Sequence, residues 1–132
     1  MLKRTIDTTA GLAEITRTGI LVTDPELRLT ATGAVASFTV AAHERRFDPV
    51  TGHWVDIGTT FLPCSIGRHA ADNVAESLST GTRVLITGVL RQRQWETTTG
   101  DQRYACELHA TEVAVSLKHA TVQVTKAEHQ QE

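Results

Sequence analysis

The chain has 132 residues and a formal net charge of -2, from 13 lysines and arginines and 15 aspartates and glutamates, which argues against polyanion binding by bulk charge. Hydrophobic residues make up 40% and charged residues 21%, as in one folded domain rather than a disordered chain. Neither an apolar run of about 18 residues nor a secretory leader is visible, so we expect a cytoplasmic protein without membrane contact.

Short strands separated by turns are the first expected elements. The many Thr and Val residues favour strands. Turns are expected at residues 23–26, where Pro occupies a favoured corner position, and at residues 32–33. The segments 48–52 and 97–101 are typical of hairpin tips.

Alternating apolar residues predict half-buried strands over 34–42, 60–66 and 103–110. The more continuously apolar segment 82–89 is typical of a central, buried strand. Phe38 is expected in the core, whereas Tyr104 would need a partner or water for its hydroxyl. The expected inward faces are Ala36, Phe38, Val40 and Ala42 in the first strand, Leu62, Cys64 and Ile66 in the second, and Tyr104, Cys106, Leu108 and Ala110 in the third.

One segment, residues 70–78, has the apolar spacing of a helix, and Gly81 is expected to end it. The order is then three strands, one helix and two or more strands. This order predicts an all-β protein with an OB-fold, a five-stranded barrel with one α-helix between strands 3 and 4. A β-sandwich with an incidental helix is the alternative, and the position of the helix favours the barrel.

No pattern in the chain predicts catalysis. The histidines form no HExxH, HxH or Cys/His cluster, and Ser65, Ser77 and Ser116 lack a nucleophile-elbow context. No glycine-rich phosphate loop follows a strand. We therefore expect no enzyme activity, no cofactor and no metal, with Cys64 and Cys106 as reduced thiols.

Arginines interleaved with aromatic residues are the informative feature. Guanidinium groups contact phosphates and rings stack on unpaired bases, which is the chemistry of single-stranded nucleic acid binding. Alternatively, the rings cover the barrel ends and the arginines form a solvated edge. A bulge at Gly88 would decide which face Arg91, Arg93 and Trp95 share. The candidate DNA-binding residues are Arg45, Arg46, Phe47, Trp54, Phe61, Arg91, Arg93 and Trp95.

Several segments resemble bacterial single-stranded DNA-binding proteins in family order. The resemblance runs from about residue 12 to 118. It implies an OB-fold that assembles as a homotetramer, a dimer of dimers, and wraps single-stranded DNA without sequence preference in replication, recombination and repair, at the nucleoid. The segments are 19–28, 33–41, 51–52, 73–78, 81–84, 88–91, Trp95 and 100–104.

The resemblance also suggests roles for single residues. Trp95 and Phe61 match stacking positions of the family, and a further stacking position falls at Arg46 or Phe47. An aromatic position six residues after Phe61 is Gly67 in this chain. We therefore expect weaker binding per subunit than in an ordinary family member.

The end of the chain resembles that of the actinobacterial subgroup, in which an extra strand contacts a neighbouring subunit. The expected organisation is an N-terminal segment over 1–11, the DNA-binding domain over 12–115, an inter-subunit strand over 116–126 and a frayed tail over 127–132. The family's acidic tip is not found before Glu132, which fits a paralogue without the tail or a shortened chain, and predicts loss of tail-dependent replication and repair partners.

The sequence is also compatible with two other functions. The same domain could serve as a protein-interaction module with weakened DNA binding, which the substitution at Gly67 and the near-neutral charge favour. It could also bind RNA, since no residue recognisably contacts a 2'-hydroxyl.

Overall fold

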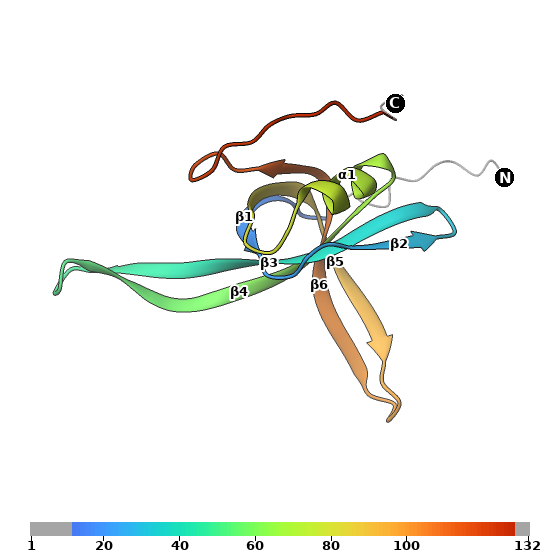
Figure 1. Ribbon diagram of the computed structural model, residues 1–132. Coiled ribbons are helices and arrows are strands. Elements are labelled where there is room, and N and C mark those ends of the chain that lie inside the picture. The colour runs from blue at the N-terminus through green and yellow to red at the C-terminus, as the bar shows by residue number, and fades with distance from the viewer. Residues whose placement is uncertain (1–11, 129–132) are drawn as a thin grey trace.

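A single sheet of six strands and one helix form the fold, in a computed structural model that describes residues 12–128 (Figure 1). The expected N-terminal segment 1–11 and residues 129–132 of the expected tail lie outside the described residues. The elements are β1 (Glu14–Leu21), β2 (Glu26–Thr30), β3 (Gly33–Asp48), β4 (His53–Gly67), α1 (His69–Ser77), β5 (Arg83–Glu96) and β6 (Gln102–Val115).

The strand order is β1-β5-β6-β4-β3-β2, and β1 also pairs with β3 at Ile20 and Leu21. This second pairing of β1 curls the sheet back on itself, as the OB-fold requires and a two-sheet sandwich does not. The β4–β6 contact is parallel and short, with Cys64 opposite Leu108. The predicted OB-fold is therefore confirmed. The helix follows the fourth strand, because residues 26–30 pair with β3 as a short additional strand.

The core lies inside this curled sheet, beneath α1. The inward face predicted for the second strand is confirmed, since Leu62, Cys64 and Ile66 are buried. In the first strand Ala36, Phe38 and Val40 are buried as predicted, whereas Ala42 is only partly buried and its neighbour Ala41 is buried. The largest fully buried side chains are Leu21, Val40, Val84, Ile86 and Leu108.

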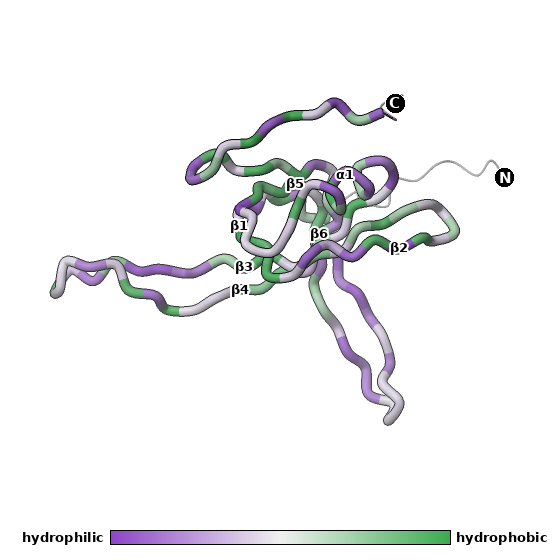
Figure 2. The backbone as a smooth tube through the Cα atoms, viewed as in Figure 1, coloured by the Kyte–Doolittle hydropathy of each residue, from purple (hydrophilic) through white to green (hydrophobic). Residues whose placement is uncertain are grey.

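Three residues expected inside lie at the surface. Tyr104 is 54% exposed and Cys106 is also exposed, because β5 and β6 continue beyond the barrel as a free hairpin. Figure 2 shows this hairpin as largely hydrophilic. Leu85, in the apolar run expected to be central, projects to the outer face of β5 and is half exposed. Alternation alone does not reveal where a strand leaves the core.

Two long hairpins project from the barrel in different directions (Figure 1). The β3–β4 hairpin turns at Gly52, whose φ is 72° and whose N–H donates to the Asp48 carbonyl at 2.8 Å. The β5–β6 hairpin turns at Gly100, whose φ is 89° and whose N–H donates to the Thr97 carbonyl at 3.0 Å. Both predicted hairpin tips are confirmed, and both need a residue that tolerates positive φ.

Residues 116–128 leave the end of β6 and run past α1 in an extended path (Figure 1). The Ser116 N–H donates to the Arg83 carbonyl at 2.9 Å, which fixes the start of this segment. No strand is formed by residues 116–128 in the single chain, so the inter-subunit strand expected over 116–126 stays a prediction.

Candidate nucleic-acid interface

Phe61 lies on the outer face of β4. The side chains of Leu62 and Cys64 are buried, and neighbouring residues in a strand point to opposite faces. Phe61 therefore projects outward, and its side chain is 61% exposed. Its partner in β3 is Ala41, which is too small to cover the ring.

A β-bulge decides where the aromatic residues of the β3–β4 hairpin point. The register shifts between Glu44 and Arg45, so that Gly58 faces Glu44, Asp56 faces Arg45 and Ile57 is the extra residue. Strict alternation would place Trp54 and Phe61 on opposite faces of β4. The extra residue reverses this, and both rings lie on the same face.

Phe47 joins Trp54 on this face because the two are directly opposite in the ladder. Their ring centroids lie 5.5 Å apart at an interplanar angle of 66°, an edge-to-face contact. Phe47 is 47% exposed and Trp54 is 65% exposed. The pair is an ordered aromatic surface near the tip of the hairpin, with most of the Trp54 ring open to solvent.

The two arginines before Phe47 project to different faces. Arg45 lies on the aromatic face, where its Nε contacts Asp56 Oδ1 at 3.0 Å, and both side chains are mostly exposed. An exposed pair of this kind contributes less than about 1 kcal/mol. Arg46 is paired with Val55 and lies on the other face. Of the two positions that the resemblance left open, Phe47 is the one that accompanies Trp54.

On the β5–β6 hairpin, Arg91, Arg93 and Trp95 share the outer face. The register shift between Thr87 and Gly88 places the extra residue, Thr111, in β6, so the alternation of β5 is uninterrupted. The bulge at Gly88 therefore leaves Arg91, Arg93 and Trp95 on the face to which Leu85 projects.

Arg93 is held by two neighbours. Its guanidinium carbon lies 4.7 Å from the centroid of the Trp95 ring, a cation–π contact, and its Nε contacts Glu107 Oε1 at 2.9 Å. The other oxygen of Glu107 lies 3.5 Å from His109 Nε2. Trp95 is 40% exposed, and because Arg93 covers one face of the ring, a base can stack on the other.

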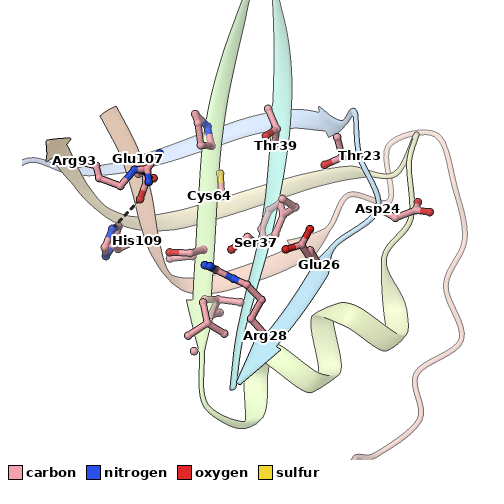
Figure 3. A pocket seen from close by; sticks show the side chains of 17 residues that line it. Thr23, Asp24, Glu26, Arg28, Ser37, Thr39, Cys64, Arg93, Glu107 and His109 are labelled. Carbon is pink, nitrogen blue, oxygen red and sulfur yellow. Dashed lines mark ion pairs between the residues drawn. The ribbon is translucent and has the colours of Figure 1, made fainter. Parts of the chain in front are cut away.

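A recess of about 700 Å³ lies on this outer face, between β2 and the β5–β6 hairpin (Figure 3). Its floor is formed by residues of β3 and β4 that include Ser37, Ser65 and Gly67. One wall is formed by Glu26 and Arg28 of β2, and the opposite wall by Arg93, Glu107 and His109. Of the wall residues, only Arg93 is a candidate from the sequence, and the others were missed, although Glu107 and His109 stand on the outward side of a predicted strand.

Two titratable groups near the recess have shifted pKa values. Burial raises the pKa of the Cys64 thiol to about 12, against a smaller opposing effect of the Arg17 charge. Cys64 is therefore protonated at neutral pH and is not a nucleophile. The pKa of Asp24 is lowered by hydrogen bonds from the backbone N–H and then the hydroxyl of Thr80, at 2.8 and 2.9 Å.

The described part of the chain offers little other chemistry. Within residues 12–128, no group of three or more His, Cys, Asp or Glu side chains is placed to hold a metal ion. Cys64 and Cys106 are both free thiols. None of the helices in residues 12–128 is long and apolar enough to cross a membrane. The ordered aromatic and arginine surface is the feature of the outer face that points to a ligand.

Residues 12–116 match the model of the single-strand binding protein family. A single-stranded DNA-binding protein of Mycolicibacterium smegmatis is 50% identical over 119 residues, covering 89% of this chain and 72% of that protein. Single-stranded DNA-binding protein 2 of Streptomyces coelicolor is 51% identical over 118 residues, covering 89% of this chain and 59% of that protein.

Solved structures have the same fold. A crystal structure of a small single-stranded DNA-binding protein from Streptomyces coelicolor superimposes with a TM-score of 0.71 at 27% identity, covering 81% of this chain and 96% of that one. A Plasmodium falciparum protein of this kind, solved with single-stranded DNA, gives a TM-score of 0.68 at 20% identity, covering 88% of this chain and 99% of that one.

Proposed function

Because the chain belongs to the single-strand binding protein family, we propose that it binds and protects single-stranded DNA without enzymatic activity, in replication, recombination and repair at the nucleoid. One observation carries the proposal at the level of residues. Phe47, Trp54, Phe61 and Trp95 lie on the same outer face of the sheet, and each is at least 40% exposed. Each solvent-facing ring is a surface on which an unpaired base can stack, for about 1–3 kcal/mol.

The DNA path follows from this arrangement. The DNA strand would pass from the Phe47–Trp54 pair along the β3–β4 hairpin to Phe61, across the recess, and on to Trp95. Arg45, Arg91 and Arg93 would contact phosphates, whereas Arg46 lies on the other face and would contribute less. The interaction module suggested by the sequence is not favoured, because the chain belongs to the single-strand binding protein family and is 50% identical to a single-stranded DNA-binding protein.

Salt dependence should be moderate. Arg45 and Arg93 already contact Asp56 and Glu107, so each neutralises a phosphate only as far as it leaves its carboxylate. The affinity for single strands falls with log salt at about -0.7 per phosphate neutralised, so a shallow slope is expected. Stacking would then supply a large share of the free energy of binding.

A homotetramer, built as a dimer of dimers, completes the proposal. The segment 116–126 carries exposed apolar side chains, including Val122 and Val124, and a strand of a second subunit would cover them. Light scattering on the protein alone tests the mass, and a monomer in solution would contradict this part.

The test of the function is a titration with oligo(dT) of increasing length, followed by tryptophan fluorescence. Stacking on Trp54 and Trp95 should quench the emission until each binding site is filled, which also gives the site size. Duplex DNA of the same length should cause little quenching. Equal affinity for duplex and single strands would contradict the proposal, and matched RNA oligomers would show which polymer is preferred.

A further inference from the structure

The recess on the outer face has the size of a binding site but not the surface of a stacking platform. Its volume of about 700 Å³ is within the range of small-molecule pockets. The floor carries Val35, Ser37 and Thr39 of β3 and Pro63, Ser65 and Gly67 of β4, so a base entering it would meet hydroxyls and aliphatic groups rather than an aromatic ring. A side chain at Gly67 would meet only the Ala34 carbonyl oxygen, at 3.7 Å, so packing does not require a glycine there.

Each wall of the recess combines an arginine with a carboxylate. Glu26 and Arg28 are two positions apart on β2 and face Ser37 and Val35 of β3. Figure 3 shows both side chains projecting toward the floor from one side, and Arg93, Glu107 and His109 lying on the other. The recess is therefore lined with hydrogen-bond acceptors as well as donors.

The carboxylates do not fit a site that contacts phosphate alone. Both would repel the DNA backbone, and Glu26 has no side-chain hydrogen bond or ion pair to another of residues 12–128 that would neutralise it. Glu107 is paired with Arg93 and His109, yet each carboxylate oxygen can accept a further hydrogen bond. Groups of this kind recognise N–H donors, and on DNA these donors are on the bases.

Among unpaired bases, cytosine, guanine and adenine, whose 6-amino group lies beside the N1 acceptor, match such a wall. Cytosine presents a 4-amino donor beside the N3 acceptor, and guanine presents N1–H and a 2-amino group beside O6. A carboxylate accepts from the amino group while an arginine donates to the adjacent acceptor. Uracil and thymine have a carbonyl oxygen in place of the 4-amino group, so the same carboxylate would face an acceptor.

We propose that the recess between β2 and the β5–β6 hairpin binds the edge of an unpaired base that carries an exocyclic amino group, with Glu26 as the principal acceptor and Arg28 as the donor. The inference rests on the proposed single-stranded DNA binding and gives it a base preference. Chains of cytosine should bind more tightly than chains of uracil, whose bases differ only at the 4-substituent and the N3 proton.

The test compares oligo(dC) and oligo(dU) of one length, labelled at one end, by fluorescence anisotropy at matched salt and slightly alkaline pH. The wild-type protein should bind oligo(dC) at least about fivefold more tightly. Glu26→Gln should reduce this ratio toward one, mainly by strengthening the binding of oligo(dU). Glu76→Gln, an exposed carboxylate on α1 outside the recess, removes the same charge and should leave the ratio unchanged.

A second variant tests the recess itself. Gly67→Trp should fill it without backbone strain, raise the affinity for oligo(dU) and remove the preference for oligo(dC). Equal wild-type affinities for the two oligonucleotides, or an unchanged ratio in Glu26→Gln, would overturn the inference while the proposed function stands. If neither oligonucleotide binds the wild-type protein, the proposed function itself fails.

Discussion

Replacing Trp95 by alanine should weaken the binding of an oligonucleotide short enough to occupy one subunit by the free energy of one stacked base. Arg93 lies over one face of the ring at 4.7 Å, so a single face is available and a single base is lost. At about 1–3 kcal/mol per stacked base, the dissociation constant should rise about 5- to 150-fold. The loss of the cation–π contact adds little, because Glu107 still holds Arg93 at 2.9 Å.

The assay is fluorescence anisotropy with a labelled oligo(dT) at one salt concentration, which does not depend on the tryptophan that is removed. Tyr104→Ala is the matched control. Tyr104 is an exposed aromatic residue of the same hairpin, but it is paired with Gln94 and lies on the face opposite to Trp95. Tyr104→Ala should change the affinity less than about twofold. A similarly small effect of Trp95→Ala, or an equal loss in the control, would refute the assignment of the binding face.

Three further predictions concern stability and reactivity. Gly88→Ala should lower the free energy of unfolding by about 1–3 kcal/mol in a denaturant titration, because the new Cβ would overlap the backbone of β6. Thiol alkylation at pH 8 should modify Cys106 in the folded protein and Cys64 only after unfolding, since the pKa of Cys64 is about 12. The folded-state pKa of Asp24 is lowered by Thr80, so its stabilisation is present above the ordinary value of 3.8 and lost as the pH falls through the folded-state pKa. Asp24→Asn should therefore be less stable than the wild type at neutral pH, and the difference in thermal unfolding should shrink at low pH.

The sequence predicts the fold well because the core strands alternate regularly. Leu62, Cys64 and Ile66 were expected inside and are buried, and the single helix lies within one residue of its expected start. Tyr104 was misplaced because its strand continues beyond the barrel, where alternation persists without a core. Such a boundary is set by tertiary packing and leaves no local signal.

The candidate site was predicted in its residue types but not in its geometry. The arginines and rings were identified, yet Arg46 was grouped with Arg45 although they project to different faces. The ion partners Asp56 and Glu107 went unnoticed, because cross-strand pairs follow from a register that depends on bulges. A bulge adds one residue to one strand, and neighbouring sequence seldom shows which strand receives it.

Because of the bulge at Ile57, the number of residues between Trp54 and Phe61 determines which face of the β3–β4 hairpin carries the aromatic rings near its tip. Removing one residue between Trp54 and Phe61 would rotate the tip by one step of alternation and present its rings to the opposite side. Changes of length in the turn at 49–52 would leave the pairing of β3 with β4 unchanged. The length of the turn is therefore free to vary in evolution or design. The number of residues in the paired strands is constrained, because a change of one residue moves the rings to the opposite face.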